Sequence, residues 1–418
     1  MRRALTTPAL FLAGALALSA CGGGGGAAAS LVSADGVKTG PGVTDDAITL
    51  GVMTDLTGPF KDLATTLQIG HKMWVDEVNA AGGICGRQIA LETLDHGFKA
   101  ETAAIQFPTI EPKVAGFMEM LGSSVIAVLA SEVNEKQVTT LAVSWSSELL
   151  GQPHVIIVGT TYDLEVINGL DWMLEQGTIK KGDTLGHIYI EGDYGANGLA
   201  GSRYFAKQNG LKVAPEKITA TDTDMQSIVT KFKSQGVKAI VLSVTPPQTA
   251  SAAANNAGLG LNVPMLGNSI SFAPVLLETP AANALERLYI AASAAPYDSP
   301  VAKAKELRAK FEAENPKERP TFAVQYGYAQ GVIWSQILAK ACAAKDLTRA
   351  GIDAALKSSK SLKTDKLVSK LDFSKPGSPS SRDVYIAQVD KATPGGLKQV
   401  QGLKEFPDAK TYKAPKES

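Results

Sequence analysis

Short apolar runs alternate with longer amphipathic segments along this chain. Apolar runs such as residues 48–53 and 89–94 are typical of buried strands. Between them, residues 63–78 carry apolar side chains at helical spacing. Strands that alternate with helices predict parallel sheets with helices on both faces.

This alternation occurs in two successive series, which predicts two doubly wound α/β domains. A helix expected at residues 164–176 opens the second series. The broken stretch 371–389 is expected to form a hairpin plus a final strand. Ligands of such sheets bind beyond the carboxyl ends of the strands. Further strands are expected at 114–120, 140–144, 185–190, 213–218, 239–244 and 288–292, and helices at 100–110, 199–209, 225–234, 302–314 and 323–343.

Composition narrows the class of protein. Of the 418 residues, 44% are hydrophobic and 20% are charged, which supports an apolar core and excludes disorder as the main state. Lys+Arg and Asp+Glu both number 41, so no basic excess exists to neutralise nucleic-acid phosphates. Three cysteines without a CxxC pair are too few for a disulfide scaffold.

The N-terminus predicts export. Arg2 and Arg3 precede a short apolar stretch at residues 9–18, which is the pattern of a secretory signal peptide. The segment Leu-Ser-Ala before Cys21 resembles a bacterial lipobox, which implies cleavage after residue 20 and a diacylglycerol on Cys21. The alternative is an ordinary signal peptide with an incidental cysteine. We expect an extracytoplasmic protein anchored to the cell membrane by this lipid, with residues 21–45 as a flexible Gly/Ala/Ser-rich tether.

Known catalytic patterns are missing. No GxGxxG follows the first strand, and GxxxxGK[ST], GxSxG and HExxH do not occur. The four histidines are scattered, and isolated histidines are usually structural. The sequence therefore predicts neither a cofactor nor a metal site, and the protein is not expected to be an enzyme.

Three motifs resemble those of branched-chain amino-acid-type periplasmic binding proteins, the solute-binding proteins of ABC importers. Residues 48–59 resemble the family's opening strand and Leu-Thr-Gly-Pro loop, and residues 75–87, VDEVNAAGGICGR, resemble its most specific motif. Residues 192–198 begin Gly-Asp-Tyr-Gly and resemble the signature of the second lobe. The helix segment QYGYA at residues 325–329 matches a later block, so the resemblance covers about residues 47–390.

The resemblance implies the type I periplasmic binding protein fold, with two doubly wound lobes joined by a three-crossing hinge. Crossings are expected near residues 159–163, 292–297 and 382–384. The expected boundaries place residues 46–160 and 292–383 in lobe 1, and residues 161–291 and 384–418 in lobe 2.

Cys85 and Cys342 remain after lipidation, and an even pair in an oxidising compartment favours one disulfide. Two buried free thiols are the alternative. The lobe arrangement implied by the resemblance places both cysteines in lobe 1, so that the bond is topologically possible.

The resemblance implies a lipid-anchored solute-binding protein that delivers a small ligand to an ABC permease and its ATPase subunits. We expect a monomer. A ligand-sensing receptor component and, less favoured, an extracytoplasmic hydrolase are the alternatives. An amino acid, an amide and a carboxylic acid all remain candidate ligands. Residues 267–269 offer no carboxylate, and an ammonium group is costly to bury unpaired.

Candidate ligand-binding residues lie where predicted strands end or helices begin. Hydroxyls and N–H groups at a helix start can hold a carboxylate, although a simple serine cap is the alternative. The loop at residues 145–147 offers an aromatic wall with hydroxyl donors, unless its tryptophan packs inward. The family places a ligand-covering tyrosine at Tyr194, which is otherwise a surface aromatic. The candidates are Ser123, Ser124, Trp145, Ser146, Ser147, Tyr194 and Asn268.

Overall fold

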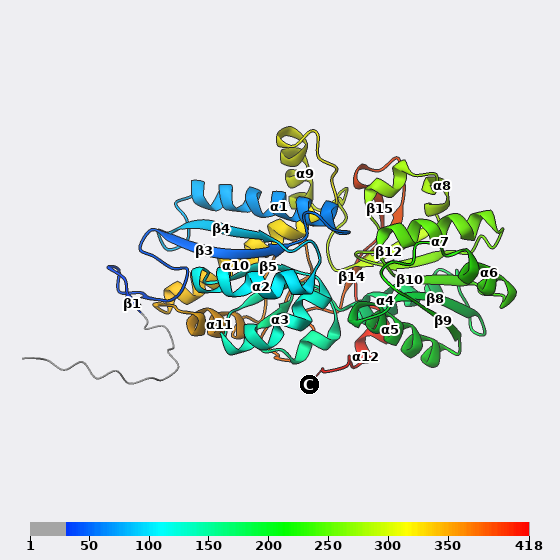
Figure 1. The fold of residues 1–418 in the computed structure, drawn as a ribbon, viewed down its shortest axis with the longest axis horizontal. Helices are drawn as coiled ribbons and strands as arrows, with labels where there is room; N and C mark the ends of the chain where they lie inside the picture. Colours follow the sequence, from blue (N-terminus) through cyan, green and yellow to red (C-terminus); the bar gives the residue numbers. More distant parts are fainter. Residues whose placement is uncertain (1–30, 418) are drawn as a thin grey trace, which may run out of the picture.

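The computed structural model describes residues 31–417, which form two lobes lying side by side (Figure 1). The names lobe 1 and lobe 2 are kept for the residue ranges given above. The predicted signal peptide, residues 1–20, and the lipidation site Cys21 lie outside the described residues.

Over the described residues, lobe 1 is built on five parallel strands in the order β4-β3-β5-β6-β7. The central strand β5 is buried along its whole length, as expected for a strand covered on both faces. The strands are β3 (Ala47–Thr54), β4 (Gln88–Asp95), β5 (Gly116–Leu121), β6 (Thr140–Val143) and β7 (Val155–Ile157). The helical segments are α1 (Lys61–Ala80), α2 (Ala100–Ile110), η1 (Glu111–Lys113), α3 (Ser123–Glu135), η2 (Ser147–Gly151), α9 (Ala302–Glu314), α10 (Ala323–Ala343) and α11 (Arg349–Lys357).

Lobe 2 has a seven-stranded sheet within the described part of the chain, in the order β15-β14-β12-β11-β10-β8-β9. The strands from β9 to β12 are parallel, whereas β14 and β15 are antiparallel. The strands are β8 (Thr184–Ile190), β9 (Lys212–Ile218), β10 (Ala239–Ser243), β11 (Met265–Asn268), β12 (Leu288–Ala292), β14 (Val384–Val389) and β15 (Leu397–Lys404). The helical segments are α4 (Tyr162–Glu175), α5 (Asp193–Asn209), α6 (Gln226–Ser234), α7 (Pro246–Gly258), η3 (Pro274–Glu278), α8 (Ala282–Leu285), η4 (Pro394–Gly396) and α12 (Pro407–Thr411).

The predicted fold class, two doubly wound parallel-sheet lobes, is confirmed. The chain passes between the lobes after β7, after β12 and before β14 (Figure 1). The boundary residues of the lobes stay a prediction. The hairpin expected within residues 371–389 is wrong, because β14 pairs with β15 around a Pro-Gly-Gly turn at residues 394–396. Pro376 and Pro379 lack the backbone donor that a strand ladder needs.

The described part of the predicted flexible tether is folded against lobe 1. Strands β1 (Leu31–Val32), β2 (Lys38–Thr39) and β13 (Asp346–Leu347) form a small sheet there. The buried guanidinium of Arg87 lies 3.0 Å from the Asp35 carboxylate, and Val37 is buried. The glycine content of this segment predicts a flexible tether. Asp35 and Val37 nevertheless pack against lobe 1, because their partners lie far away in the sequence.

The predicted Cys85–Cys342 disulfide is confirmed. Its two Cα atoms lie 6.4 Å apart, although the cysteines are separated by 257 positions in the sequence. Cys85 follows the carboxyl end of α1, and Cys342 lies in the last turn of α10, which packs beside α1. The disulfide therefore joins the two chain segments that make up lobe 1, residues 46–160 and residues 292–383.

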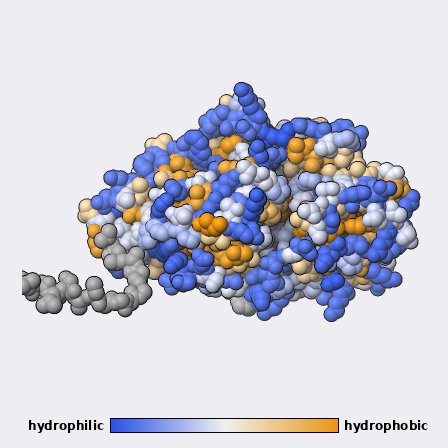
Figure 2. Space-filling view, in the orientation of Figure 1, coloured by the Kyte–Doolittle hydropathy of each residue, from blue (hydrophilic) through white to orange (hydrophobic). Residues whose placement is uncertain are grey.

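Hydrophilic residues cover most of the face shown in Figure 2. Hydrophobic residues gather on lobe 1 over α2 and α3, where Ile105 and Val128 are exposed. The large side chains Trp74, Trp145 and Trp334 are fully buried in the core.

Candidate functional site

A cavity of about 520 Å³ lies between the lobes, and both lobes contribute equally to its wall. Half of the described residues that line it have aliphatic or phenyl side chains, and none of them is basic. Lobe 1 contributes Phe60, Leu63, Phe98, Leu121, Gly122, Ser123, Ser124, Ala127 and Val143, and lobe 2 contributes Tyr162, Ile190, Glu191, Gly192, Asp193, Tyr194, Ala220, Thr245 and Ile270.

Two strand-to-helix turns face each other across this cavity. The helix α3 begins directly after β5 in lobe 1, and α5 begins directly after β8 in lobe 2. The residue before each helix, Gly122 or Gly192, has φ near 104°, which L side chains rarely adopt. A Cβ atom at Gly122 would also lie 2.8 Å from the Phe98 ring. Glycine therefore lets the chain turn sharply at the cavity wall.

The start of α3 supplies the polar end of the cavity. Ser123 and Ser124 occupy its first turn, which contains no acidic residue and no side-chain cap. The Ser123 hydroxyl lies 2.7 Å from that of Ser144 and within hydrogen-bond reach of Tyr162. Free N–H groups at a helix start attract anions because of their partial positive charge. This end of the cavity can hold a carboxylate.

Tyr162 and Tyr194 form the aromatic wall on the lobe 2 side, with ring centroids 4.6 Å apart. The Tyr194 hydroxyl donates to the Val244 carbonyl and lies 3.1 Å from Ser271 Oγ. Burial raises the pKa of Tyr194, so its hydroxyl stays protonated. Because this hydroxyl is already engaged inside lobe 2, Tyr194 offers its ring to the cavity.

The seven candidate residues fall into two groups. Ser123, Ser124 and Tyr194 line the cavity. Trp145, Ser146, Ser147 and Asn268 are buried and do not belong to its lining. Ligand contact by any of the seven stays a prediction.

Trp145 and Ser146 are engaged within the protein. Trp145 donates to the Val158 carbonyl over 3.0 Å and packs its ring against Tyr162 and Tyr326. The Ser146 hydroxyl caps the short helix η2 by accepting from the backbone N–H of Glu148. The loop at residues 145–147 thus adopts the packed alternative considered from the sequence.

Ser147 belongs to a buried polar cluster below the cavity, which we call the hinge cluster: Ser147, Asn197, Asp163 and Tyr412. Asn197 in lobe 2 accepts from the Ser147 backbone N–H over 3.1 Å and donates to the Ser147 hydroxyl. The same amide donates to the Asp163 carboxylate over 3.0 Å, and the Tyr412 hydroxyl donates to it over 2.9 Å. These contacts join lobe 1 to two separate segments of lobe 2.

Asn268 donates a hydrogen bond to a buried carboxyl group within lobe 2, that of Glu165. Glu165 Oε2 accepts from the Asn268 amide and from the backbone N–H and hydroxyl of Ser269, at 3.1–3.2 Å. Glu165 Oε1 has no partner. Burial raises the pKa of Glu165 to about 8, and these hydrogen bonds lower it only in part. The carboxyl group is therefore mostly protonated at neutral pH.

The apolar wall was missed by the sequence analysis, which sought polar groups. Phe60 and Phe98 lie edge to face with ring centroids 4.9 Å apart, and both line the cavity. Phe60 directly follows the Leu-Thr-Gly-Pro loop, and Ile190 ends β8. Apolar residues at the carboxyl ends of the predicted parallel strands are the sequence pattern that could have predicted this apolar wall.

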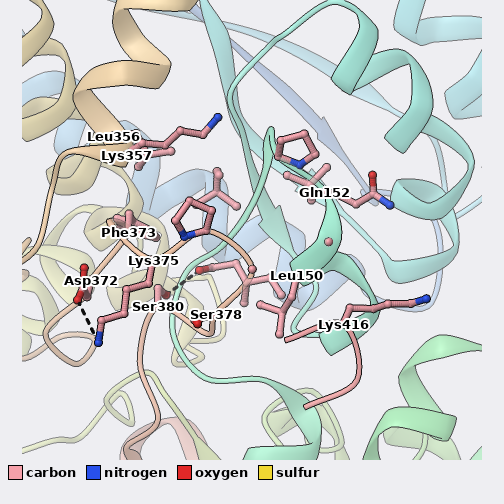
Figure 3. Close-up of a pocket in the computed structure, with 17 residues that line it drawn as sticks. Leu150, Gln152, Leu356, Lys357, Asp372, Phe373, Lys375, Ser378, Ser380 and Lys416 are labelled. Atoms are coloured by element: carbon pink, nitrogen blue, oxygen red, sulfur yellow. Dashed lines mark hydrogen bonds and ion pairs between the residues drawn. The ribbon is translucent and has the colours of Figure 1, made fainter. Parts of the chain in front are cut away.

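Further cavities lie outside this site, and two of them matter for the comparison with it. One, of about 240 Å³, adjoins it and shares the lining residues Phe60, Leu63 and Ile270. The other, of about 360 Å³, lies in lobe 1 between β7 and the loop at residues 372–380, and Figure 3 shows Lys357, Lys375 and Lys416 at its edge. That third cavity shares no lining residue with the first two.

Residues 31–417 contain no group of three His, Cys, Asp or Glu side chains placed to hold a metal ion. Within the same range, each helix is too short or too polar to span a bilayer.

Comparisons with known proteins agree with this architecture. The profile of a family described as periplasmic binding protein matches residues 47–394. The Leu/Ile/Val-binding protein homolog 3 of Brucella melitensis is 27% identical over 199 residues, which cover 46% of this chain and 53% of the relative. The Leu/Ile/Val-binding protein BraC3 of Rhizobium johnstonii is 24% identical over 226 residues, which cover 53% and 60% respectively. The chain thus matches little more than half the length of these curated relatives.

Solved structures match over most of the chain. A fatty acid ABC transporter substrate-binding protein from Thermomonospora curvata is 37% identical, with a TM-score of 0.89 over 92% of this chain and 99% of its own. A branched-chain amino acid ABC transporter protein from Thermus thermophilus with bound valine is 16% identical, with a TM-score of 0.75 over 89% and 98%. The second likeness shows the fold alone.

Proposed function

Because the chain belongs to the periplasmic binding protein family, we propose that it is the substrate-binding protein of an ABC importer and that its ligand is a fatty acid. Family membership implies an extracytoplasmic location. In the proposed cycle, the lobes enclose the ligand and present it to a membrane permease with its ATPase subunits.

The observation that carries the ligand class is the chemistry of the cavity between the lobes. One end, at Ser123 and Ser124, offers donors for a carboxylate, and most of the remaining wall is apolar. A fatty acid has this distribution of polar and apolar groups. The Thermomonospora curvata protein named for fatty acids is also more similar to this chain than the amino-acid binders reported above.

Branched-chain amino acids are the competing ligands. Their ammonium group needs a carboxylate partner when it is buried. Of the acidic residues in the lining, Glu191 is exposed and lies 3.8 Å from Lys217, and Asp193 lies in the first turn of α5. Glu165 is excluded from the lining and mostly protonated at neutral pH. This arrangement supports a carboxylate with an apolar chain over a zwitterion.

Thermal unfolding in the presence of dodecanoate, leucine or valine tests the ligand class. A ligand that binds only the folded state raises Tm, and the rise grows with the logarithm of its concentration relative to Kd. We expect dodecanoate to raise Tm and both amino acids to leave it unchanged. Dodecanol is the matched control without a carboxylate and should bind more weakly. A rise with leucine and none with dodecanoate would contradict the proposed ligand.

Ser124→Ala tests the carboxylate end. A hydrogen bond to a charged group contributes about 1.5–3 kcal/mol, so dodecanoate affinity should fall by at least tenfold. Ser234→Ala, an exposed serine of α6, is the matched control and should retain wild-type affinity. Equal affinities of the two variants would place the carboxylate elsewhere.

We also propose that Cys21 carries a lipid anchor and that the protein acts as a monomer. The sequence before Cys21 supports the anchor. Cys21→Ser should move the protein from the membrane fraction to the soluble fraction, and an unchanged membrane fraction would contradict the anchor. Light scattering of the Cys21→Ser protein, with and without dodecanoate, should give the mass of one chain. A dimer mass would contradict the monomer.

A further inference from the structure

The main cavity between the lobes adjoins the smaller cavity of about 240 Å³. Phe60, Leu63 and Ile270 line both, so the two cavities adjoin at these side chains, which we call the gate. Phe60 and Leu63 belong to lobe 1, and Ile270 belongs to lobe 2. The boundary between the two cavities therefore lies between the lobes, and a ligand that reaches from one cavity into the other must pass these three side chains.

Most of the residues that line the second cavity are apolar. It is formed by the loop before α1, the start of α7, the segment that includes η3, and the start of α10. The apolar lining residues are Pro59, Phe60, Leu63, Pro246, Pro247, Ile270, Phe272, Ala273, Val275, Leu276 and Phe322.

The polar residues of this lining are engaged elsewhere or lie in solvent. The Thr321 hydroxyl lies 2.7 Å from that of Thr66, and Asp62 faces Arg319 at 3.7 Å. Lys61 is exposed. The second cavity thus offers few free partners to a polar group of a ligand. A hydrocarbon chain would be stabilised there because it would be removed from water.

On the basis of the proposed function, we propose that the second cavity is a subsite for the distal part of a long acyl chain. The carboxylate lies at Ser123 and Ser124, the proximal methylenes fill the main cavity, and the distal methylenes pass the gate. The second cavity then makes the protein selective for long-chain over short-chain fatty acids. Each buried methylene raises the affinity by about fourfold, so a few methylenes beyond the gate give a large preference.

The experiment compares octanoate and palmitate, titrated by calorimetry below their micelle concentrations. Ala273→Trp fills the second cavity, and Ala127→Trp, its matched control, fills the main cavity from α3. Both alanines are at least partly exposed, so both positions can accept a larger side chain. We expect Ala273→Trp to weaken palmitate binding by at least tenfold and to leave octanoate binding within twofold of wild type. Ala127→Trp should weaken the binding of both acids.

An equal effect of Ala273→Trp on octanoate and palmitate, or no effect on palmitate, would overturn the subsite. Failure of the wild-type protein to bind either acid would instead overturn the proposed function. Ala273→Leu and Ala127→Leu provide the same comparison with smaller side chains, should either tryptophan variant fail to fold.

Discussion

The cavity between the lobes and the hinge cluster below it are close in space but opposite in chemistry. Half of the residues that line the cavity have aliphatic or phenyl side chains, among them Phe60, Leu63 and Ile270. The hinge cluster consists of buried polar side chains, in which Asp163 and Asn197 each have several hydrogen-bond partners. The hinge cluster connects the lobes through the protein itself, whereas in the proposed function the cavity connects them through a ligand.

Because of this difference, we expect the cavity to determine ligand affinity and the hinge cluster to determine how the two lobes are held together. Apolar burial is non-directional and scales with the area removed from water, so the cavity can accept chains of varied length. Hydrogen bonds between buried groups require defined geometry, and a buried group left without its partner is costly. We therefore expect substitutions in the hinge cluster to change stability and substitutions in the cavity to change affinity.

Removal of the disulfide sharpens this separation, because the bond is remote from both regions. The 20-residue helix α1 spans about 30 Å, with the second cavity at its start and Cys85 beyond its end. Loop-entropy models assign such a long closed loop about 4–5 kcal/mol. The double variant Cys85→Ser/Cys342→Ser should lose about this much unfolding free energy in urea, while its dodecanoate affinity stays at the wild-type value. A loss of dodecanoate affinity in this variant would contradict the separation, because it would show that ligand binding depends on the stability of lobe 1.

Asp163→Ala should have the next largest effect. The substitution removes one of the two acceptors of the Asn197 amide and the acceptor of the buried Tyr412 hydroxyl, at about 1–3 kcal/mol for each unsatisfied group. Urea unfolding should show a loss of roughly 3–4 kcal/mol. Asp45→Ala, at an exposed position before β3, is the control and should change stability far less. A loss below about 1 kcal/mol for Asp163→Ala would show that the hinge cluster does not stabilise the lobes.

The pH dependence of stability tests Glu165. Burial raises its pKa to about 8 in the folded protein, from an ordinary value of 4.5. The folded state then binds the extra proton between these values, so Glu165 makes stability fall as pH rises through this window. Between pH 6.5 and 8 its contribution should amount to about 2 kcal/mol, which Glu165→Gln removes.

Glu119, in the core of lobe 1, is the matched control for Glu165. Burial raises its pKa to about 8 as well, and it accepts from Thr54 over 2.5 Å. Burial lowers the pKa of the neighbouring His71 to about 4. His71 is therefore neutral between pH 6.5 and 8 and does not contribute to the pH dependence in this window. Glu119→Gln should flatten the pH profile of stability by a similar amount without a change in affinity. An unaltered profile in both variants would mean that neither carboxyl is protonated near neutral pH.

Leu63→Ala tests the apolar wall. Leu63 is half-buried and lines both cavities, so the truncation removes hydrocarbon contact with the ligand but little core packing. We expect a loss of about 1.5 kcal/mol in ligand binding, roughly tenfold in palmitate Kd, with unfolding free energy nearly unchanged. The reverse result, a lower unfolding free energy with unchanged palmitate affinity, would contradict the expectation that the cavity determines affinity and the hinge cluster determines stability.

The smallest effect is expected at the mouth of the cleft. Arg319 of lobe 1 lies 2.6 Å from Glu278 of lobe 2, and both side chains are substantially exposed. An exposed ion pair contributes about 0.2–1 kcal/mol and is screened by salt. Glu278→Gln should speed ligand release less than fivefold in stopped-flow measurements, and only at low salt. Glu175→Gln, which breaks the pair with Lys404 within lobe 2, should not affect release.

The sequence alone predicted the two parallel-sheet lobes, because strand and helix periodicities are local patterns. Helices α2, α9 and α10 have the predicted bounds, since their apolar spacing is continuous. The short strands β7 and β11 were missed, because four residues or fewer carry little periodic signal.

Tertiary structure decided the chemistry of the site. Ser147 and Asn268 have the polar side chains of ligand-binding residues, but their partners Asn197 and Glu165 come from distant segments that the fold brings together. Hydroxyl and amide groups look alike in a sequence whether they face a ligand or another buried side chain. The apolar cavity likewise arises only where the ends of several strands and helices from both lobes converge, because its volume is a property of their packing and not of any single segment.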